Sequence, residues 1–184
     1  MYLARILYPI KVLGPGNRVG IWFCGCPRRC EGCSNPELWE FQNRYKTSLA
    51  TVMALIEKIT QAHSVDGFTI TGGDPFFQPD ALSRLLEQIK KVSDDILIYT
   101  GYMKDELPDP MLNNIAVLID APYIKAQNNN CLLRGSDNQT IYILSEKYRD
   151  AYEKYLATAE NQIQNFATRD GYISVGIHRP DFKF

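Results

Sequence analysis

Three closely spaced cysteines constrain this chain more than any other feature of its sequence. Cys26, Cys30 and Cys33 form a C-x3-C-x2-C run, and Cys24 lies two residues before it. Three thiolates so close together are expected to bind one compact metal centre. In a [4Fe–4S] cube each protein-bound iron takes one cysteine sulfur, so three cysteines leave one iron open to another ligand. The alternative is a structural zinc ion completed by Cys24, but zinc ribbons usually bring a second C-x2-C pair, which this sequence lacks.

Length and composition are those of one ordinary soluble domain. The chain has 184 residues, of which 45% are hydrophobic and 22% charged, and its formal net charge is -1. This balance argues against a broad electrostatic surface for nucleic acid or anionic membrane. No apolar run approaches the ~18 residues of a membrane helix, and the N-terminus lacks the pattern of a signal peptide. We therefore expect a single domain over 1–184, a cytoplasmic location, and no nucleic-acid or membrane partner.

Strand and helix patterns alternate along the chain, which predicts an α/β fold with a parallel or mostly parallel sheet. The expected strands cover 18–23, 68–71, 95–100, 115–119 and 140–144. Helices are expected at 49–59 behind a cap at Thr47 or Ser48, at 79–92 starting with Pro79, and at 148–159. A last strand is expected at 173–177 after a turn at Asp170-Gly171, which together predict a terminal hairpin.

The cysteine run resembles the signature of the radical S-adenosylmethionine (SAM) superfamily. Its surroundings, Gly14-Pro15-Gly16-Asn17-Arg18 before a strand and Ser34-Asn35-Pro36-Glu37-Leu38-Trp39 after the last cysteine, are similar to the small activating enzymes of glycyl radical enzymes. The group most resembled is that of the activating components of anaerobic (class III) ribonucleotide reductases. The resemblance covers a core of about 14–144 and implies a shortened, incomplete radical SAM (β/α) barrel. The rest, about 145–184, is expected to be a C-terminal extension made of a helix and a β-hairpin.

The resemblance also implies two cofactors and the residues that hold them. Cys26, Cys30 and Cys33 would bind a [4Fe–4S] cluster. Thr71-Gly72-Gly73-Asp74-Pro75 resembles the glycine-rich motif that binds the amino group of SAM. Glycines let backbone carbonyls approach a ligand closely, and Asp74 adds negative charge for an ammonium group. Asn35 and Thr100 complete the expected cofactor-binding set, although Thr100 is equally explained by a turn that ends a strand.

The activity implied is reductive cleavage of SAM to methionine and a 5′-deoxyadenosyl radical. In the resembled family this radical abstracts hydrogen from a glycine of a partner glycyl radical enzyme, and an electron donor such as flavodoxin or ferredoxin supplies the electron. The cofactors carry the chemistry, so no catalytic side chain is assigned. Two alternatives stay open: a radical SAM enzyme that modifies a peptide or small molecule, and a non-catalytic metal-binding module.

Several features have no settled role in the sequence. The segment Arg134–Gln139 resembles the last block shared by the small activases, and it would shape the SAM pocket, dock the partner or order a long loop. Ala121 stands where the family more often has glycine, and Gln162–Phe184 has no family counterpart. Cys24 is expected to be a small buried residue at a strand end. Cys131 has no assigned role, and His178 is expected on the surface.

Overall fold

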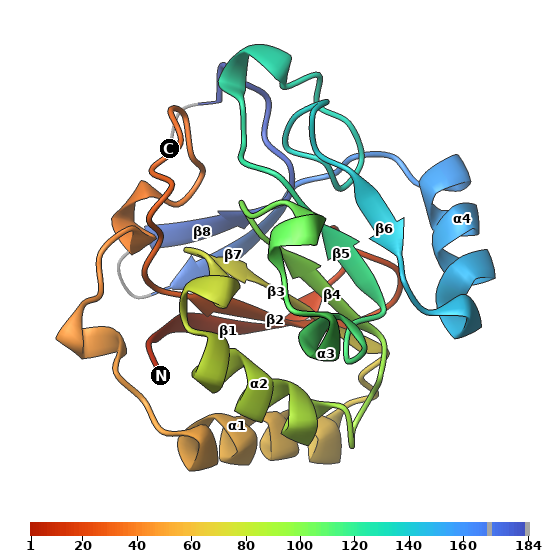
Figure 1. Ribbon diagram of the computed structural model, residues 1–184. Coiled ribbons are helices and arrows are strands. Elements are labelled where there is room, and N and C mark those ends of the chain that lie inside the picture. Colours follow the sequence, from red (N-terminus) through yellow and green to blue (C-terminus); the bar gives the residue numbers. More distant parts are fainter. Residues whose placement is uncertain (169–170, 183–184) are drawn as a thin grey trace.

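The computed structural model describes residues 1–168 and 171–182, which form a mixed α/β fold around one six-stranded sheet (Figure 1). Its strands are β1 (Leu3–Ile10), β2 (Arg18–Phe23), β3 (Gly67–Gly72), β4 (Ile96–Tyr99), β5 (Val117–Ile119) and β6 (Ile141–Ile143). They lie in chain order; β2 to β5 are parallel, and β1 and β6 pair antiparallel at the two edges. The predicted mostly parallel sheet is therefore confirmed. Within the described residues the sheet is open.

The strand β1 was not among the expected elements. Most of its side chains are half-buried, without the alternation of buried and exposed positions that marks a typical edge strand. It pairs with β2 through a register that shifts twice along its length. An N-terminal antiparallel strand therefore precedes the parallel part of the sheet.

Two of the helices begin where local sequence signals place them, and the short helix Asp109–Leu112 was not among the expected elements. The helices are α1 (Leu49–Ala62), α2 (Pro79–Ile89), α3 (Asp109–Leu112) and α4 (Arg149–Thr158). The Ser48 hydroxyl caps α1 by accepting the N–H of Thr51 at 3.0 Å, and α2 starts with Pro79. The expected continuation of α2 to Val92 is wrong, because the helix ends at Ile89 and Val92 lies exposed. No helix of the described residues is long and apolar enough to cross a membrane.

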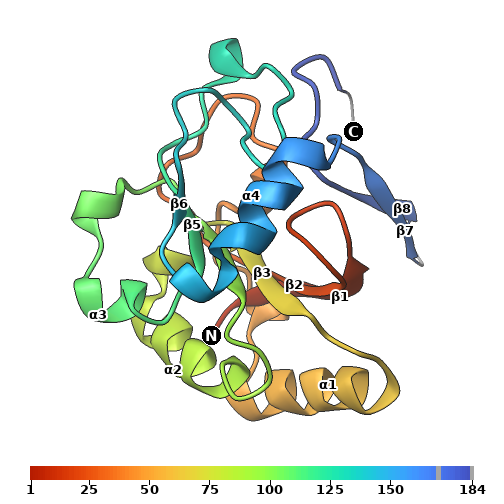
Figure 2. The same ribbon diagram turned by 90° about the vertical axis from the view of Figure 1, so that its right-hand side faces the viewer.

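The two faces of the sheet bury different side chains because successive strand residues point in opposite directions. On β4, Ile96 and Ile98 pack in the main core with α1 and α2. Leu97, between them, packs on the other face with Tyr152 of α4. Figure 2 shows α4 crossing that face, away from α1 and α2.

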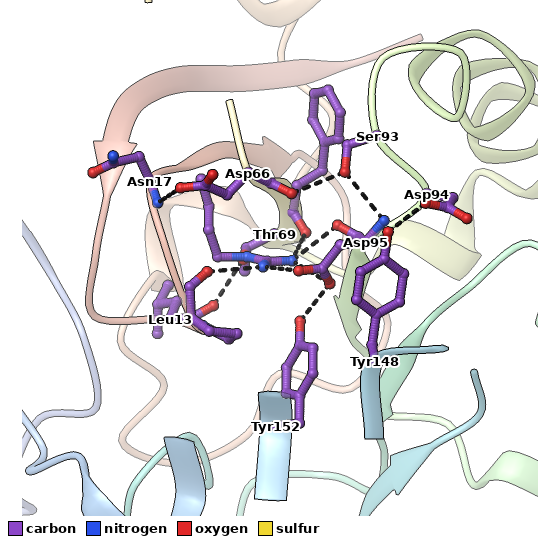
Figure 3. A network of polar contacts seen from close by, with 12 residues as sticks. Leu13, Asn17, Asp66, Thr69, Ser93, Asp94, Asp95, Tyr148 and Tyr152 are labelled. Carbon is purple, nitrogen blue, oxygen red and sulfur yellow. Dashed lines mark hydrogen bonds and ion pairs between the residues drawn. The ribbon is translucent and has the colours of Figure 1, made fainter. Parts of the chain in front are cut away.

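A buried ion pair joins the sheet to α4 at the start of β2 (Figure 3). The guanidinium of Arg18 is fully buried and donates to both carboxylate oxygens of Asp95, at 2.7 and 3.1 Å. Arg18 also donates to Thr69 Oγ1 at 2.8 Å, and the Tyr152 hydroxyl donates to Asp95 Oδ1 at 2.7 Å. Every charge in this group therefore has a partner, as buried charges require. The network connects β2, β3, the start of β4 and α4.

The C-terminal extension has the expected helix and hairpin. After α4 come β7 (Gln164–Thr168) and β8 (Gly171–Val175), which pair antiparallel. Of the predicted turn, Asp170 lies outside the described residues, as do the last two residues of the extension. The strand ends at Val175 and does not continue to Ile177, because Gly176 adopts φ +134°, a conformation that L side chains rarely take.

Candidate active site

One pocket lies where the parallel strands β2, β3 and β4 end. The carboxyl ends of parallel strands share one edge of a sheet, and this is where open α/β folds bind ligands. The pocket wall combines the cysteine loop after β2, the exits of β3, β4 and β5, the loop at 135–139, and the segment Gly176–His178. Segments that are far apart in the sequence thus meet at one place.

Cys26, Cys30 and Cys33 all line this pocket, as the sequence predicts they should if they act together. Two backbone hydrogen bonds hold the base of their loop: the Gly25 N–H donates to the Leu38 carbonyl and the Cys26 N–H to the Trp39 carbonyl, each at 2.8 Å. The short 3-10 helix Pro36–Leu38 is therefore fixed against the cysteine loop.

The environment of the thiols is partly desolvated. Burial raises the pKa of Cys26 and of Cys33. For Cys33, the Asn35 N–H and the Trp39 indole act in the opposite direction and lower the pKa, because both stabilise negative charge on sulfur. The Asn35 N–H lies 3.4 Å from Cys33 Sγ. The Asn35 N–H therefore points at the atom that would bind a metal.

The other two cysteines lie outside the site. Cys24 is fully buried at the end of β2, as expected, and its thiol donates to the Glu40 carbonyl at 2.8 Å. Cys131 lies near Asp137 and lines a different cavity. A structural zinc ion needs four ligands, whereas three of the five cysteines line this pocket. Among the described residues no three His, Cys, Asp or Glu side chains, these three cysteines included, converge on one ion position. A donor set of three thiols on one pocket instead fits a cube with one open iron.

The glycine motif packs directly against the cysteine loop. A Cβ on Gly72 would lie 2.3 Å from the Phe23 carbonyl oxygen, and one on Gly73 would lie 2.4 Å from the Gly25 carbonyl oxygen. Hydrogen bonds from Gly73 N–H to Phe23 (2.7 Å) and from Asp74 N–H to Gly25 (2.8 Å) fix this contact. Only glycine allows so close an approach, so the motif and the cysteine loop form one unit.

Asp74 has a role inside the protein as well as a place on the pocket. Its buried carboxylate accepts hydrogen bonds from the Thr100 hydroxyl (3.0 Å), the Gly101 N–H (2.8 Å) and the Phe76 N–H (3.0 Å). Burial raises the pKa of Asp74, and these donors counteract the rise. The carboxylate therefore joins the end of β3 to the end of β4.

The remaining predicted site residues divide between the pocket and its surroundings. Asn35 and Thr100 line the pocket together with Gly72 and Gly73. Pro75 is buried and does not line the pocket; it begins the 3-10 helix Pro75–Phe77.

The segment Arg134–Gln139 orders its own loop and also reaches the pocket. The Gln139 side chain accepts from the Gly135 N–H at 2.7 Å and donates to the Ala121 carbonyl at 3.0 Å. Gly135 and Gln139 both line the pocket. Ala121 adopts φ +75°, a conformation that favours glycine, which accounts for the glycine more often found at this position in the resembled family.

Several pocket residues were not foreseen. His178 was expected on the surface, but it is 7% exposed and lines the pocket with Ile177. Trp39 and Tyr99 also line it, and Trp39 Nε1 and the Tyr99 hydroxyl are buried with no hydrogen-bond partner among the described residues. Trp39 stands in the segment that follows Cys33, and this closeness in sequence is a signal for a place at the site. Nothing in the sequence around His178 indicates a place at the site, because its contact with the pocket depends on the path of the chain after the hairpin.

The sequence is also similar to those of known proteins. A family model described as "4Fe-4S single cluster domain" matches residues 12–142. The chain is 34% identical over 142 residues to the anaerobic ribonucleoside-triphosphate reductase-activating protein of Enterobacteria phage T4, covering 74% of this chain and 90% of that protein. It is 35% identical over 147 residues to the protein of the same name from Vibrio cholerae, covering 73% and 94%. It is also 27% identical over 135 residues to the pyruvate formate-lyase-activating enzyme of Clostridium pasteurianum, covering 68% and 56%.

Proposed function

The chain belongs to the 4Fe-4S single cluster domain family and to the anaerobic ribonucleoside-triphosphate reductase-activating proteins, and from this premise we propose that it is a radical SAM enzyme that activates a glycyl radical enzyme. Its substrate would be a glycine of an anaerobic ribonucleotide reductase. The observation that carries this proposal is the single pocket on which three cysteines and the glycine-rich exit of β3 meet. The open sheet around it is consistent with an incomplete radical SAM barrel.

Cys26, Cys30 and Cys33 are the proposed ligands of the [4Fe–4S] cluster. They are the three cysteines on the pocket, and Cys24 is engaged elsewhere. Together with SAM, the bound cluster supplies a 5′-deoxyadenosyl radical. The chain itself holds the base of the cysteine loop through the backbone hydrogen bonds of Gly25 and Cys26.

Gly72, Gly73, Asp74, Thr100 and Asn35 are the proposed SAM-binding residues. Gly72 and Gly73 have no side chain and so expose their backbone beside the cysteine loop. A side chain at either position would collide with carbonyl oxygens. Asp74 and Thr100 hydrogen-bond each other, so the carboxylate both supports the pocket and adds negative charge near an ammonium group. Pro75 contributes by starting the turn that follows, without reaching the ligand.

The partner is proposed to be a glycyl radical enzyme whose glycine-bearing loop enters the pocket. An electron donor such as flavodoxin or ferredoxin would supply the single electron. With a net charge of -1 and no helix in the described residues able to cross a membrane, we assign neither nucleic-acid nor membrane binding.

The test is formation of a glycyl radical in trans. The anaerobically reconstituted, reduced protein is mixed with SAM and the large subunit of an anaerobic ribonucleotide reductase from the same source, and the radical is measured by electron paramagnetic resonance. We expect a radical with the unchanged protein and with Cys131→Ala, and none with Cys30→Ala. If SAM is cleaved but no radical forms on the reductase, the substrate is a different one, and the alternative of a peptide or small-molecule substrate takes its place.

A further inference from the structure

Part of the pocket wall comes from outside the region that the family model matches. The match ends at residue 142, whereas Gly176, Ile177 and His178 follow β8 in the C-terminal extension. These three residues line the same pocket as the three cysteines and Gly73. The extension thus adds a wall to the site as well as a hairpin to the fold.

Asparagine side chains hold this wall in place. Asn161 Nδ2 donates to the Ile177 carbonyl at 2.9 Å and to Asn130 Oδ1 at 2.9 Å. Asn128 Nδ2 donates to the His178 carbonyl at 2.9 Å and to the Tyr123 hydroxyl at 3.0 Å. The segment after β8 is therefore bound to the loop that follows β5, beside which it runs in Figure 1.

The backbone at Gly176 is built for this path. Its φ is +134°, and a Cβ there would lie 2.5 Å from the Gln162 carbonyl oxygen. The glycine therefore lets the chain leave β8 and turn toward the pocket. The His178 ring is then held by a 2.8 Å hydrogen bond between its Nε2 and Ser174 Oγ. A defined conformation, and not a loose tail, presents Ile177 and His178 to the site.

We propose that the segment Gly176–His178 is a wall of the SAM site that contacts the adenosyl part of the molecule. This inference rests on the proposed function, which places the methionyl end of SAM at the cysteine loop and the Gly72–Asp74 exit of β3. What remains of SAM is a sugar carrying a flat heteroaromatic base. Such a base is recognised by apolar and aromatic surface, which Ile177, His178 and Tyr123 supply on the same pocket.

The test compares ligands that contain or lack the adenosyl group. Dissociation constants for S-adenosylhomocysteine and for methionine are measured anaerobically with cluster-loaded protein. We expect Ile177→Ala and Asn161→Ala to weaken binding of S-adenosylhomocysteine about tenfold, on the order of 1.4 kcal/mol, and to leave methionine binding unchanged. The matched control is Tyr172→Ala, on the same hairpin, where the side chain is 81% exposed and is not part of the lining of this pocket. Melting temperature and iron content of each variant separate loss of the wall from loss of the fold.

The outcomes distinguish the two proposals. If the unchanged protein binds S-adenosylhomocysteine and Ile177→Ala binds it equally well, the wall is overturned and the proposed function stands. The proposed adenosyl contact is also refuted if Tyr172→Ala weakens S-adenosylhomocysteine binding as much as Ile177→Ala does. It is refuted as well if Ile177→Ala weakens methionine binding equally, because the effect would then not be specific to the adenosyl group. If the unchanged, cluster-loaded protein binds neither ligand, the proposed function itself fails and the wall fails with it.

Discussion

Arg18 and Asp95 form a buried, doubly hydrogen-bonded ion pair at the end of the sheet where β2 starts. The guanidinium and the carboxylate meet at 2.7 and 3.1 Å, and their side chains are 0% and 7% exposed. Tyr152 and Thr69 satisfy further atoms of the pair (Figure 3). The pair fixes the helix of the C-terminal extension to the core, while the candidate active site lies where the strands end.

Asp95→Ala should therefore be among the most destabilising single changes in the chain. Removing one partner of a buried ion pair leaves an uncompensated charge and costs about 3–5 kcal/mol. The neighbouring Asp94→Ala is the control, because Asp94 pairs with Lys147 in solvent, with side chains 40% and 62% exposed, and exposed pairs contribute about 1 kcal/mol or less. Denaturant unfolding of the two variants measures the difference. If both variants lost the same free energy of unfolding, the Arg18–Asp95 pair would have no special role in stability.

The cysteine series tests which thiols bind the cluster. Cys26→Ala, Cys30→Ala and Cys33→Ala should each reduce the iron bound after anaerobic reconstitution, because each removes a ligand lining the pocket. Cys24→Ala and Cys131→Ala should keep the iron, since these thiols contact Glu40 and Asp137 instead. Iron content and visible absorption measure this. Loss of iron in Cys24→Ala alongside the other three would favour a four-cysteine site.

Gly73→Ala should damage both the SAM site and the cysteine loop. The added Cβ would lie 2.4 Å from the Gly25 carbonyl oxygen, so the backbone of one segment must move. We expect SAM to bind at least about tenfold more weakly, a change of roughly 1.4 kcal/mol. Gly101→Ala is the control on the same pocket, because its Cβ would meet the flexible Arg28 side chain at 3.0 Å. Unchanged SAM affinity in Gly73→Ala would refute the assigned role of this motif.

Trp39→Phe should make the reduction potential of the cluster more negative. The indole N–H is buried without a hydrogen-bond partner among the described residues, and the indole lowers the pKa of the Cys33 thiol. A donor near a cluster sulfur stabilises the more negative, reduced state, and phenylalanine keeps the ring but removes the donor. Trp22→Phe is the control, since Trp22 packs in a separate apolar cluster. A redox titration followed by electron paramagnetic resonance would contradict the assignment if both variants kept the same potential.

The parts of the fold that were predicted from sequence are those that a few neighbouring residues determine. Pro79 and Ser48 mark helix starts through their own backbone and side-chain chemistry, and the apolar strand 18–23 has the observed bounds of β2. The cysteine run and the glycine motif are likewise compact, and the ends of neighbouring parallel strands bring them together.

The parts that were missed depend on contacts between distant segments. The partner of Arg18 lies 77 residues away, so nothing near Arg18 indicates that its charge is buried. His178 reaches the pocket only because Gly176 turns the chain and Asn128 holds it there. Ala121 was noted as unusual for the family, but its positive φ is visible only in the structure.

Cleavage of SAM by the reconstituted protein tests the central claim most directly. The protein is loaded with iron and sulfide without oxygen, reduced and incubated with SAM, and 5′-deoxyadenosine is quantified. We predict that the unchanged protein produces 5′-deoxyadenosine and methionine in equal amounts and that Cys30→Ala produces none. A colourless protein that binds one zinc ion, or a fully loaded and reducible cluster that leaves SAM intact even with the reductase present, would contradict the account.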